Sequence, residues 1–266
     1  MSRDVSETTM VDFSQPSVRF GELTYHEIRA CAMQGWLAVI PTGCTEQQGP
    51  HLSVDFDTWF AEALMVAAAE QAAQDDEHVH ALVLPALPFG PTPEHRGFGS
   101  GYIDLPVALH AAMVEAILTS LVEQGFRRLV IWRGCGGHDL RQLVERFNQA
   151  HVGVAQVALP PPPYHAIWLR LADPAVPVGH ADSFTTSISL YLRPNTVRQE
   201  HIRDPHSTAV TWDDPQLDFT RHSATGVIGD PTHASAELGA RLWEAVVAEA
   251  AQTLKQIAQQ SWDYSI

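Results

Sequence analysis

Residues 41–59, PTGCTEQQGPHLSVDFDTW, combine side chains that could bind a metal ion. The segment carries the carboxylates Glu46 and Asp57, the imidazole of His51 and the amide of Gln48. Carboxylates and imidazoles are ligands of divalent ions in proteins. The segment could equally be a polar loop in which Asp57 caps a helix, Glu46 pairs with a surface arginine and His51 has only a local role. The spacing alone leaves both interpretations open.

A second cluster, GCGGHD at residues 134–139, places Cys135 and His138 among three glycines. Glycines allow a backbone to approach a ligand or an ion closely. A helix N-terminus at this point would lower the pKa of the Cys135 thiol, which could then ligate zinc or attack a carbonyl group. A tight turn with Cys135 as a small buried residue fits the same pattern. Two further polar loops contribute His95 and His180.

These clusters follow apolar segments that are typical of buried strands. The expected strands cover residues 36–42, 80–90, 127–133 and 153–160, and the helices next to them cover 24–35, 57–74, 106–125 and 139–151. Strands alternating with helices predict right-handed crossovers and an α/β fold, a three-layer αβα arrangement with a mainly parallel central sheet. Ligands of such sheets bind beyond the carboxyl ends of the strands, so the polar clusters are expected to meet there.

The chain is expected to form one domain. Residues 1–18 are interpreted as a flexible lead-in and residues 19–266 as a single α/β domain, because 266 residues with 45% apolar content suit one sizeable core. Beyond the prolines at 160–163 the pattern is less regular, with helices expected near 164–172 and through 184–194. An amphipathic helix closes the chain.

The charge balance excludes several classes of partner. The formal net charge is −15, which argues against binding to nucleic acid or to anionic lipid. We find no run of 18 apolar residues and no signal-peptide pattern, so we expect no membrane span and a cytoplasmic location. In a reducing compartment Cys31, Cys44 and Cys135 are free thiols or ligands rather than a disulfide framework.

The order of these motifs resembles the creatininase (creatinine amidohydrolase) family. IPTGCTEQQGPHLSVDFD is similar to the family motif G-[S/C]-x-E-Q-H-G-P-H-L-P that follows an apolar strand, RGCGGH stands in the place of N-G-H-G-G-N, and GHADSFTTS in that of H-A-G-E-x-E-T-S. LPFGPTPEHRGF and GVIGDPTHASAELG also match family segments, so the resemblance covers residues from about 20 to 260. It implies a creatininase-like fold, hydrolysis of small amides with divalent ions, and a homo-oligomer such as a hexamer.

The resemblance carries over to particular residues. Glu46 and Asp57 match metal-ligand positions, and Asp57 would bridge two ions in the family pattern. Three positions depart from that pattern: Gln48 replaces a histidine, Cys135 replaces a ligand histidine, and Thr185 replaces a glutamate. Because amide and hydroxyl groups are weak ligands, we expect one zinc ion rather than two, held by Glu46, Asp57 and Cys135. His138, which replaces an asparagine of the family pattern, or His180 is the alternative residue that would complete the shell.

The function that this implies is a metal-dependent hydrolase of a C–N bond in a small cyclic or formylated amide, acting through one zinc-activated water. His180 or His138 would transfer protons, for which a pKa near neutrality is suited. The residues expected to bind the substrate are His51, His95, Arg133 and Gln48. Arg133 could clamp a substrate carboxylate or form a structural ion pair.

Two other functions remain open at this point. A metal-free enzyme could use Cys135 as nucleophile with His138 or His180 as base, as an acyl transferase or a lyase. Alternatively, the chain could have kept only a pocket that binds a small molecule or a partner subunit, since a fold does not guarantee chemistry. A convergence of the ionisable groups at the strand ends would favour catalysis over this last function.

Overall fold

The fold is built on a parallel four-stranded sheet in the order β2-β1-β3-β4. In the computed structural model, which describes residues 17–260, β1 (Leu37–Thr42) lies between β2 (Ala81–Val83) and β3 (Arg128–Arg133), and β4 (Gln156–Ala158) pairs with β3. Every pairing is parallel, as expected for strands joined by helical crossovers. The predicted α/β class is confirmed.

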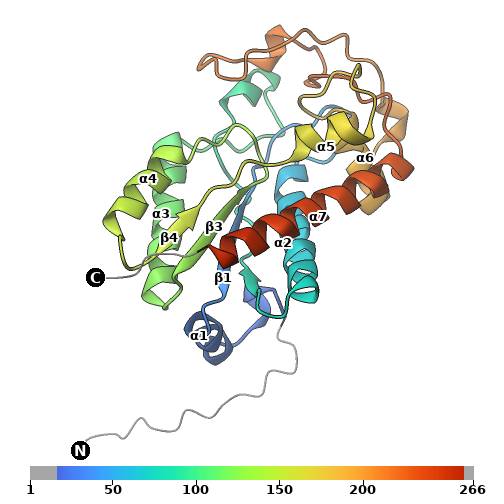
Figure 1. Cartoon of the computed structure of the whole chain (residues 1–266). Helices are drawn as coiled ribbons and strands as arrows, with labels where there is room; N and C mark the ends of the chain where they lie inside the picture. Colours follow the sequence, from blue (N-terminus) through green and yellow to red (C-terminus); the bar gives the residue numbers. More distant parts are fainter. Residues whose placement is uncertain (1–16, 261–266) are drawn as a thin grey trace, which may run out of the picture.

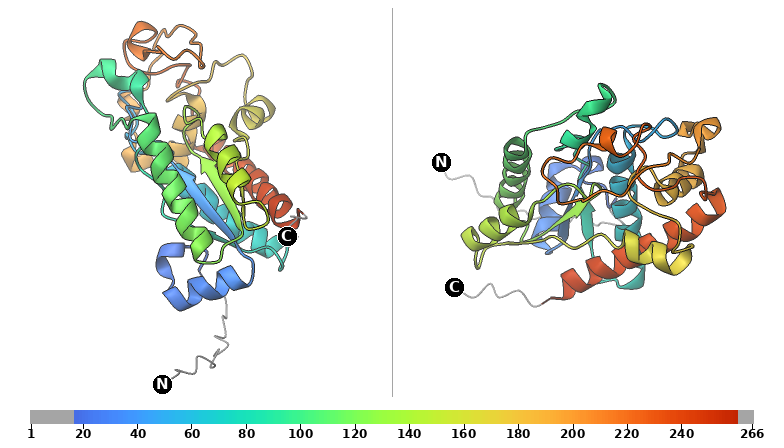
Figure 2. Two further views of the ribbon diagram at one scale, coloured as in Figure 1. Left: turned by 90° about the vertical axis from the view of Figure 1, so that its left-hand side faces the viewer. Right: turned by 90° about the horizontal axis from the view of Figure 1, so that it is seen from above.

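Helices cover both faces of this sheet (Figures 1 and 2). They are α1 (Tyr25–Met33), α2 (Phe56–Asp75), α3 (Val107–Glu123), α4 (Arg141–Ala150), α5 (Tyr164–Leu171), α6 (Ser183–Leu192) and α7 (Ala236–Gln259). Side chains alternate along β1: Val39 joins the core under α2 and α7, while Ile40 joins the core under α3 and α4. The three-layer αβα arrangement is therefore confirmed.

The irregular parts differ from the expected elements in an explicable way. The second strand ends at Val83 rather than near residue 90, because Pro85 and Pro88 cannot donate backbone hydrogen bonds to a ladder. The stretch after α6 contains short 3-10 turns at Pro194–Thr196, Gln199–His201 and Phe219–Arg221. No helix among the described residues is long and apolar enough to cross a membrane.

The proposed lead-in, residues 1–18, lies almost wholly outside the described residues. Val18 is described, and its carbonyl accepts a hydrogen bond of 2.7 Å from the backbone N–H of Val83 in β2. The division of the chain into a lead-in and a single domain stays a prediction.

The strand order places a topological switch point at the carboxyl ends of β1 and β3. The chain leaves β1 for a neighbour on one side and later returns to form β3 on the other side, so the loops after these two strands diverge. The first turn of α2 packs into this point. A Cβ atom on Gly134, directly after β3, would lie only 2.4 Å from the carbonyl oxygen of Asp57. Glycine is therefore needed for helix α2 to come this close to the sheet.

Candidate metal centre

Two buried carboxylates, Glu46 and Asp57, lie close together beyond the carboxyl end of β1, joined through Cys44. Residues 43–48 continue from β1 without helix or turn, and the alternate side chains of Cys44, Glu46 and Gln48 face the same side. The Cys44 thiol lies 3.0 Å from Oε2 of Glu46 and 3.3 Å from Oδ2 of Asp57. The thiol can donate only one hydrogen bond, so it is shared between the two carboxylates.

Gln48 connects the same two carboxylates. Its Nε2 donates to Oδ2 of Asp57 at 2.9 Å and to Oε1 of Glu46 at 3.3 Å, whereas its Oε1 is buried without a partner. From the other strand, Sγ of Cys135 lies 3.9 Å from Oε2 of Glu46. The groups after β1 and the thiol after β3 therefore lie together.

Two histidines flank Glu46. His95 Nε2 lies 3.3 Å from Oε2, and His180 Nδ1 lies 3.4 Å from Oε1. The Gln47 side chain determines the tautomer of His95. Oε1 of Gln47 accepts a hydrogen bond from the Gly49 N–H, which fixes the orientation of the amide. Nε2 of Gln47 then donates to the Gly226 carbonyl and to Nδ1 of His95. The proton of neutral His95 is then on Nε2, directed at Glu46.

His180 has the opposite arrangement. Its Nε2 lies 2.7 Å from the backbone oxygen of Gln47, to which it donates. In the neutral ring Nδ1 then presents a lone pair to the Glu46 carboxylate, an arrangement that needs a proton or a cation between the two atoms. The next residue, Ala181, has φ of 54°, the left-handed region that alanine rarely adopts. This strain is typical of functional sites.

His138 lies on the thiol side of the cluster. A donor atom of His138 lies within 4.8 Å of the sulfurs of Cys44 and Cys135. His138 is 1% exposed, and neither ring nitrogen makes a short hydrogen bond, although the Pro91 backbone lies beside the ring and acts to raise its pKa. It packs against Gly90, where a Cβ would lie 2.3 Å from Cε1 of the imidazole. A buried histidine with two unpaired nitrogens calls for a ligand.

The two carboxylates have opposite pKa shifts. Burial alone would raise the pKa of Glu46, but the neighbouring His95 and His180 outweigh burial and hold this pKa below its usual range. Burial and the negative charge of Glu46 raise the pKa of Asp57 well above its usual value. Without a cation, therefore, the site holds one carboxylate charge and resists the second.

The thiols are protonated in the absence of a cation. Burial, and then contact with Cys135, raises the pKa of Cys44 well above its usual value. A hydrogen bond with Cys44 lowers the pKa of Cys135, but burial and the charges of Glu46 and Asp57 outweigh it and bring the value to about 12. The expected low pKa of Cys135 is therefore wrong. Helix α4 begins at Arg141, too far along the chain to stabilise a thiolate at Cys135.

The proposed proton carriers also differ from expectation. Burial lowers the pKa of both His180 and His138 to about 4, rather than leaving it near neutrality. Burial acts on His95 in the same direction, but the charge of Glu46 and its hydrogen bond outweigh it and raise the pKa of His95. At neutral pH His180 and His138 are thus available as lone-pair donors.

Of the two roles open to Asp57, helix cap or member of the polar cluster, the structure has the second: α2 begins at Phe56, and the Asp57 carboxylate faces the cluster. Helix α6 is capped by Asp182, whose Oδ1 accepts from the Thr185 backbone N–H at 3.0 Å and from its hydroxyl at 3.2 Å. The Thr185 side chain is therefore engaged at the start of α6.

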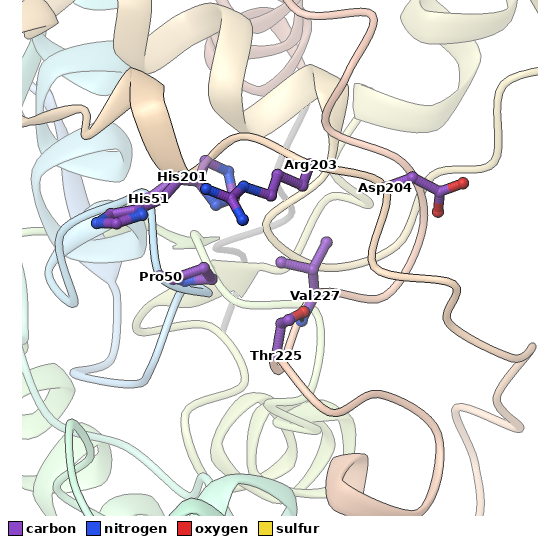
Figure 3. Close-up of a pocket in the computed structure, with 7 residues that line it drawn as sticks. All are labelled: Pro50, His51, His201, Arg203, Asp204, Thr225 and Val227. Carbon is purple, nitrogen blue, oxygen red and sulfur yellow. Dashed lines mark hydrogen bonds between the residues drawn. The ribbon is translucent and has the colours of Figure 1, made fainter.

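Two residues expected to bind the substrate lie apart from the carboxylates. His51 is fully buried, and its Nε2 lies 2.8 Å from the Thr186 hydroxyl. It lines a separate cavity of about 160 Å³ (Figure 3), whose walls are Pro50, His51, His201, Arg203, Asp204, Thr225 and Val227. Arg133 donates from Nη1 to the His138 carbonyl at 3.1 Å and so holds the 134–138 loop. The expected ion pair of Arg133 is absent from the described part of the chain.

Sequence reasoning missed two residues of the cluster. Cys44 was recognised only as a free thiol or ligand, and Gln47 was not singled out. The signal for Cys44 was present: an extended segment places residues two apart on one face, so Cys44 belongs with Glu46 and Gln48. No comparable signal existed for Gln47, because its partners His95 and Gly226 are distant in sequence.

The cluster fits a divalent ion. Three sets of residues overlap here, and within each set one donor atom per residue lies within 4.8 Å of the others. The sets are Cys44, Cys135 and His138; Glu46, His95 and His180; and Cys44, Glu46 and Asp57. Among residues 17–260, no lysine or arginine pairs with Glu46 or Asp57. Buried acids without a basic partner are costly unless a cation compensates them. The unpaired nitrogens of His138 supply the lone pairs that such a cation would use.

Comparison with known proteins identifies similar chains. A family model described as creatinine amidohydrolase matches residues 21–254. A mycofactocin precursor peptide peptidase from Mycobacterium tuberculosis is 33% identical over 221 residues, which cover 79% of this chain and 80% of the relative. A creatinine amidohydrolase from Pseudomonas putida is 27% identical over 263 residues, which cover 90% of this chain and 97% of the relative.

Solved structures share the fold. A crystal structure of creatinine amidohydrolase matches with a TM-score of 0.78 at 26% identity, covering 93% of this chain and 100% of the other. Other matching creatininase structures include a Zn-Zn form and a manganese form.

Proposed function

Because the chain belongs to the creatininase family, a family with hydrolytic members, we propose that it hydrolyses a C–N bond of a small amide with the help of a divalent ion. The observation that carries the proposal is a buried cluster in which Cys135 lies 3.9 Å from Glu46 while Cys44 contacts both Glu46 and Asp57, with no lysine or arginine counter-charge among the described residues. Scattered or salt-bridged acids would have favoured a binding protein without catalysis.

We assign the ion to Glu46, Asp57 and Cys135, as one zinc per chain. Two observations support a single ion. The Gln48 amide donates hydrogen bonds to both carboxylates at the family position of a histidine ligand. Thr185 is engaged with Asp182 and supplies no carboxylate. A thiol among the donors favours zinc over a harder ion such as manganese.

The chemistry follows from the donors and their neighbours. A bound divalent ion polarises an amide carbonyl and lowers the pKa of water. We keep His180 as the proton carrier because of its position, since Nδ1 lies 3.4 Å from Oε1 of Glu46. Its pKa of about 4 makes it a weak base that would readily return a proton to a leaving nitrogen. His95 and Gln47 orient Glu46 from the opposite side. His138 remains the alternative proton carrier.

The relatives suggest two classes of substrate. The creatinine amidohydrolase favours a small cyclic amide, whereas the more similar peptidase favours a peptide bond. Both reactions cleave a C–N bond and need the same polarised carbonyl. We place small amides first, and short peptides are the second candidate because of the 33% identity.

The test is hydrolysis of a panel of lactams, formamides and short peptides by protein of measured metal content. We expect activity that falls with ion removal, returns with zinc, and is lost in Glu46→Gln while the fold is retained. Cys31→Ala is the control, because Cys31 is a buried thiol in the hydrophobic core beneath α3 and α4 and not in the metal cluster. Full activity after complete ion removal would instead support the cysteine nucleophile, and an inactive but zinc-loaded protein would support a binding function.

The quaternary structure and location are part of this proposal. We expect a homo-oligomer such as a hexamer in the cytoplasm, acting on a small-molecule substrate. Light scattering of the purified chain measures the assembly, and a monomer at micromolar concentration would contradict this part alone.

A further inference from the structure

The thiol of Cys44 has no role in the proposed function, although it lies at the centre of the cluster. It is fully buried and comes two residues before Glu46. Its sulfur, the sulfur of Cys135 and a nitrogen of His138 all lie within 4.8 Å of one another. Adjacent ligands of a tetrahedral zinc ion with Zn–S bonds of about 2.3 Å are separated by less than this distance.

His138 supplies an independent reason to expect a ligand at this place. His138 is 1% exposed, its two ring nitrogens make no short hydrogen bond, and the loop that carries it is held by Arg133. The polar neighbours of the ring are the Pro91 backbone and the His110 ring, whose centroid lies 4.7 Å away. Gly90 leaves just enough room for the imidazole, since a Cβ there would lie 2.3 Å from it. The ring is thus fixed in place beside two thiols with lone pairs that no short hydrogen bond occupies.

We propose that Cys44, Cys135 and His138 form a three-donor site for a soft divalent ion, with Glu46 beside it. This set retains Cys135 from the proposed function, and Cys44 and His138 take the places of Glu46 and Asp57 as direct ligands. Two thiolates and one imidazole with a further open position are a donor set that zinc uses in catalytic sites. Glu46, 3.0 Å from Sγ of Cys44, is then placed beside the ion.

The donor set determines which ion binds. Thiolates favour zinc, cobalt and cadmium, whereas carboxylates and water suit manganese and magnesium. Ion binding converts both thiols to thiolates, so roughly two protons pass to the solvent for each ion. The preference for soft ions and the release of protons can both be measured without a substrate. The thiolate site can therefore be disproved while the hydrolase proposal stands, and the hydrolase proposal can be disproved while the thiolate site stands.

The test is a titration of metal-free full-length protein with cobalt, followed by displacement with zinc or manganese. We expect a near-ultraviolet thiolate-to-cobalt absorption band that falls by about half in Cys44→Ser and in Cys135→Ser, because each variant removes one of two sulfur ligands. Zinc affinity should fall at least about tenfold in both variants and in His138→Gln, since loss of an outer partner alone costs that much. Zinc, but not manganese, should displace the cobalt.

Cys31→Ser is the matched control and should keep the full band, because Cys31 is a buried thiol far from the cluster. Thermal melting of each variant establishes that it is folded before titration. The proposal is overturned by stoichiometric cobalt binding without the band, by a band that is unchanged in Cys44→Ser, by a site that prefers manganese, or by failure of the folded protein to bind cobalt at all.

Discussion

The side-chain amide of Gln48 donates a hydrogen bond of 2.9 Å to the carboxylate of Asp57. The same nitrogen lies 3.3 Å from Glu46 and so connects two acids that would otherwise repel each other. A neutral donor at this position reduces the need for a second cation. Gln48 is therefore one of the side chains on which our expectation of a single ion rests.

Gln48→His should increase the metal content from one ion per chain toward two. The imidazole presents a lone pair where the amide now presents N–H groups, and Asp57 can then bridge two ions. Elemental analysis of protein loaded with excess zinc measures this directly. Gln48→Leu removes the hydrogen bonds without adding a ligand, and its content should remain at one. Two ions in the unaltered chain would contradict the argument.

Asp57 should make the metal-free protein less stable as the pH rises. The fold raises the pKa of Asp57 above 3.8, its value in the unfolded chain. The protonated carboxyl therefore makes its full contribution to the free energy of unfolding below pH 3.8, and this contribution is lost as the pH rises through the pKa of the folded state. Asp57→Asn should abolish this loss. Melting temperatures of the metal-free proteins between about pH 5 and about pH 9 provide the measurement. Asp139→Asn, at an exposed acid with a lowered pKa of about 2, should leave the loss unchanged.

Gly90→Ala should destabilise the protein and displace His138. The new methyl group would lie 2.3 Å from the imidazole, and overpacking of this kind costs about 1–3 kcal/mol. Zinc affinity should fall in parallel. Gly136→Ala is the matched control in the adjacent loop, because no atom lies within 4 Å of a Cβ there. Equal melting temperatures for the two variants would show that the ring is not confined.

Thr186→Val should lower stability by about 1–2 kcal/mol, because it removes the 2.8 Å contact with buried His51 and leaves that ring unsatisfied. Chemical denaturation measures the change. Thr119→Val removes a helical threonine hydroxyl that bonds only to its own helix and should change stability much less. The substrate affinity of Thr186→Val should be unchanged, and a large change in KM would return His51 to the substrate site.

The alternation of strands and helices made the sheet and its three layers predictable. The continuous apolar run of β1, which is buried at every position, and capping signals such as Thr24 and Glu27 are local properties, which a sequence displays directly. The extent of the second strand was predicted less well, because the effect of Pro85 depends on which edge of the strand is paired.

The candidate site was predicted only in part, for physical reasons. Glu46, Asp57 and Cys135 could be placed together because parallel strands end at one edge. The pKa values of these residues could not be predicted from the sequence, because they depend on burial and on neighbours such as His95 that are distant in sequence. His51 was misleading for the same reason: its partner is Thr186 in α6, so its position in a polar motif does not direct it to the carboxylates.

The donors belong to separate stretches of chain: the loop after β1, the start of α2 and the loop after β3. Glu46 and Cys135 are 89 residues apart in sequence. A divalent ion bound in this cluster would link these segments across a long loop and would favour the folded chain by mass action. The metal-free chain is then expected to open first at this edge of the sheet.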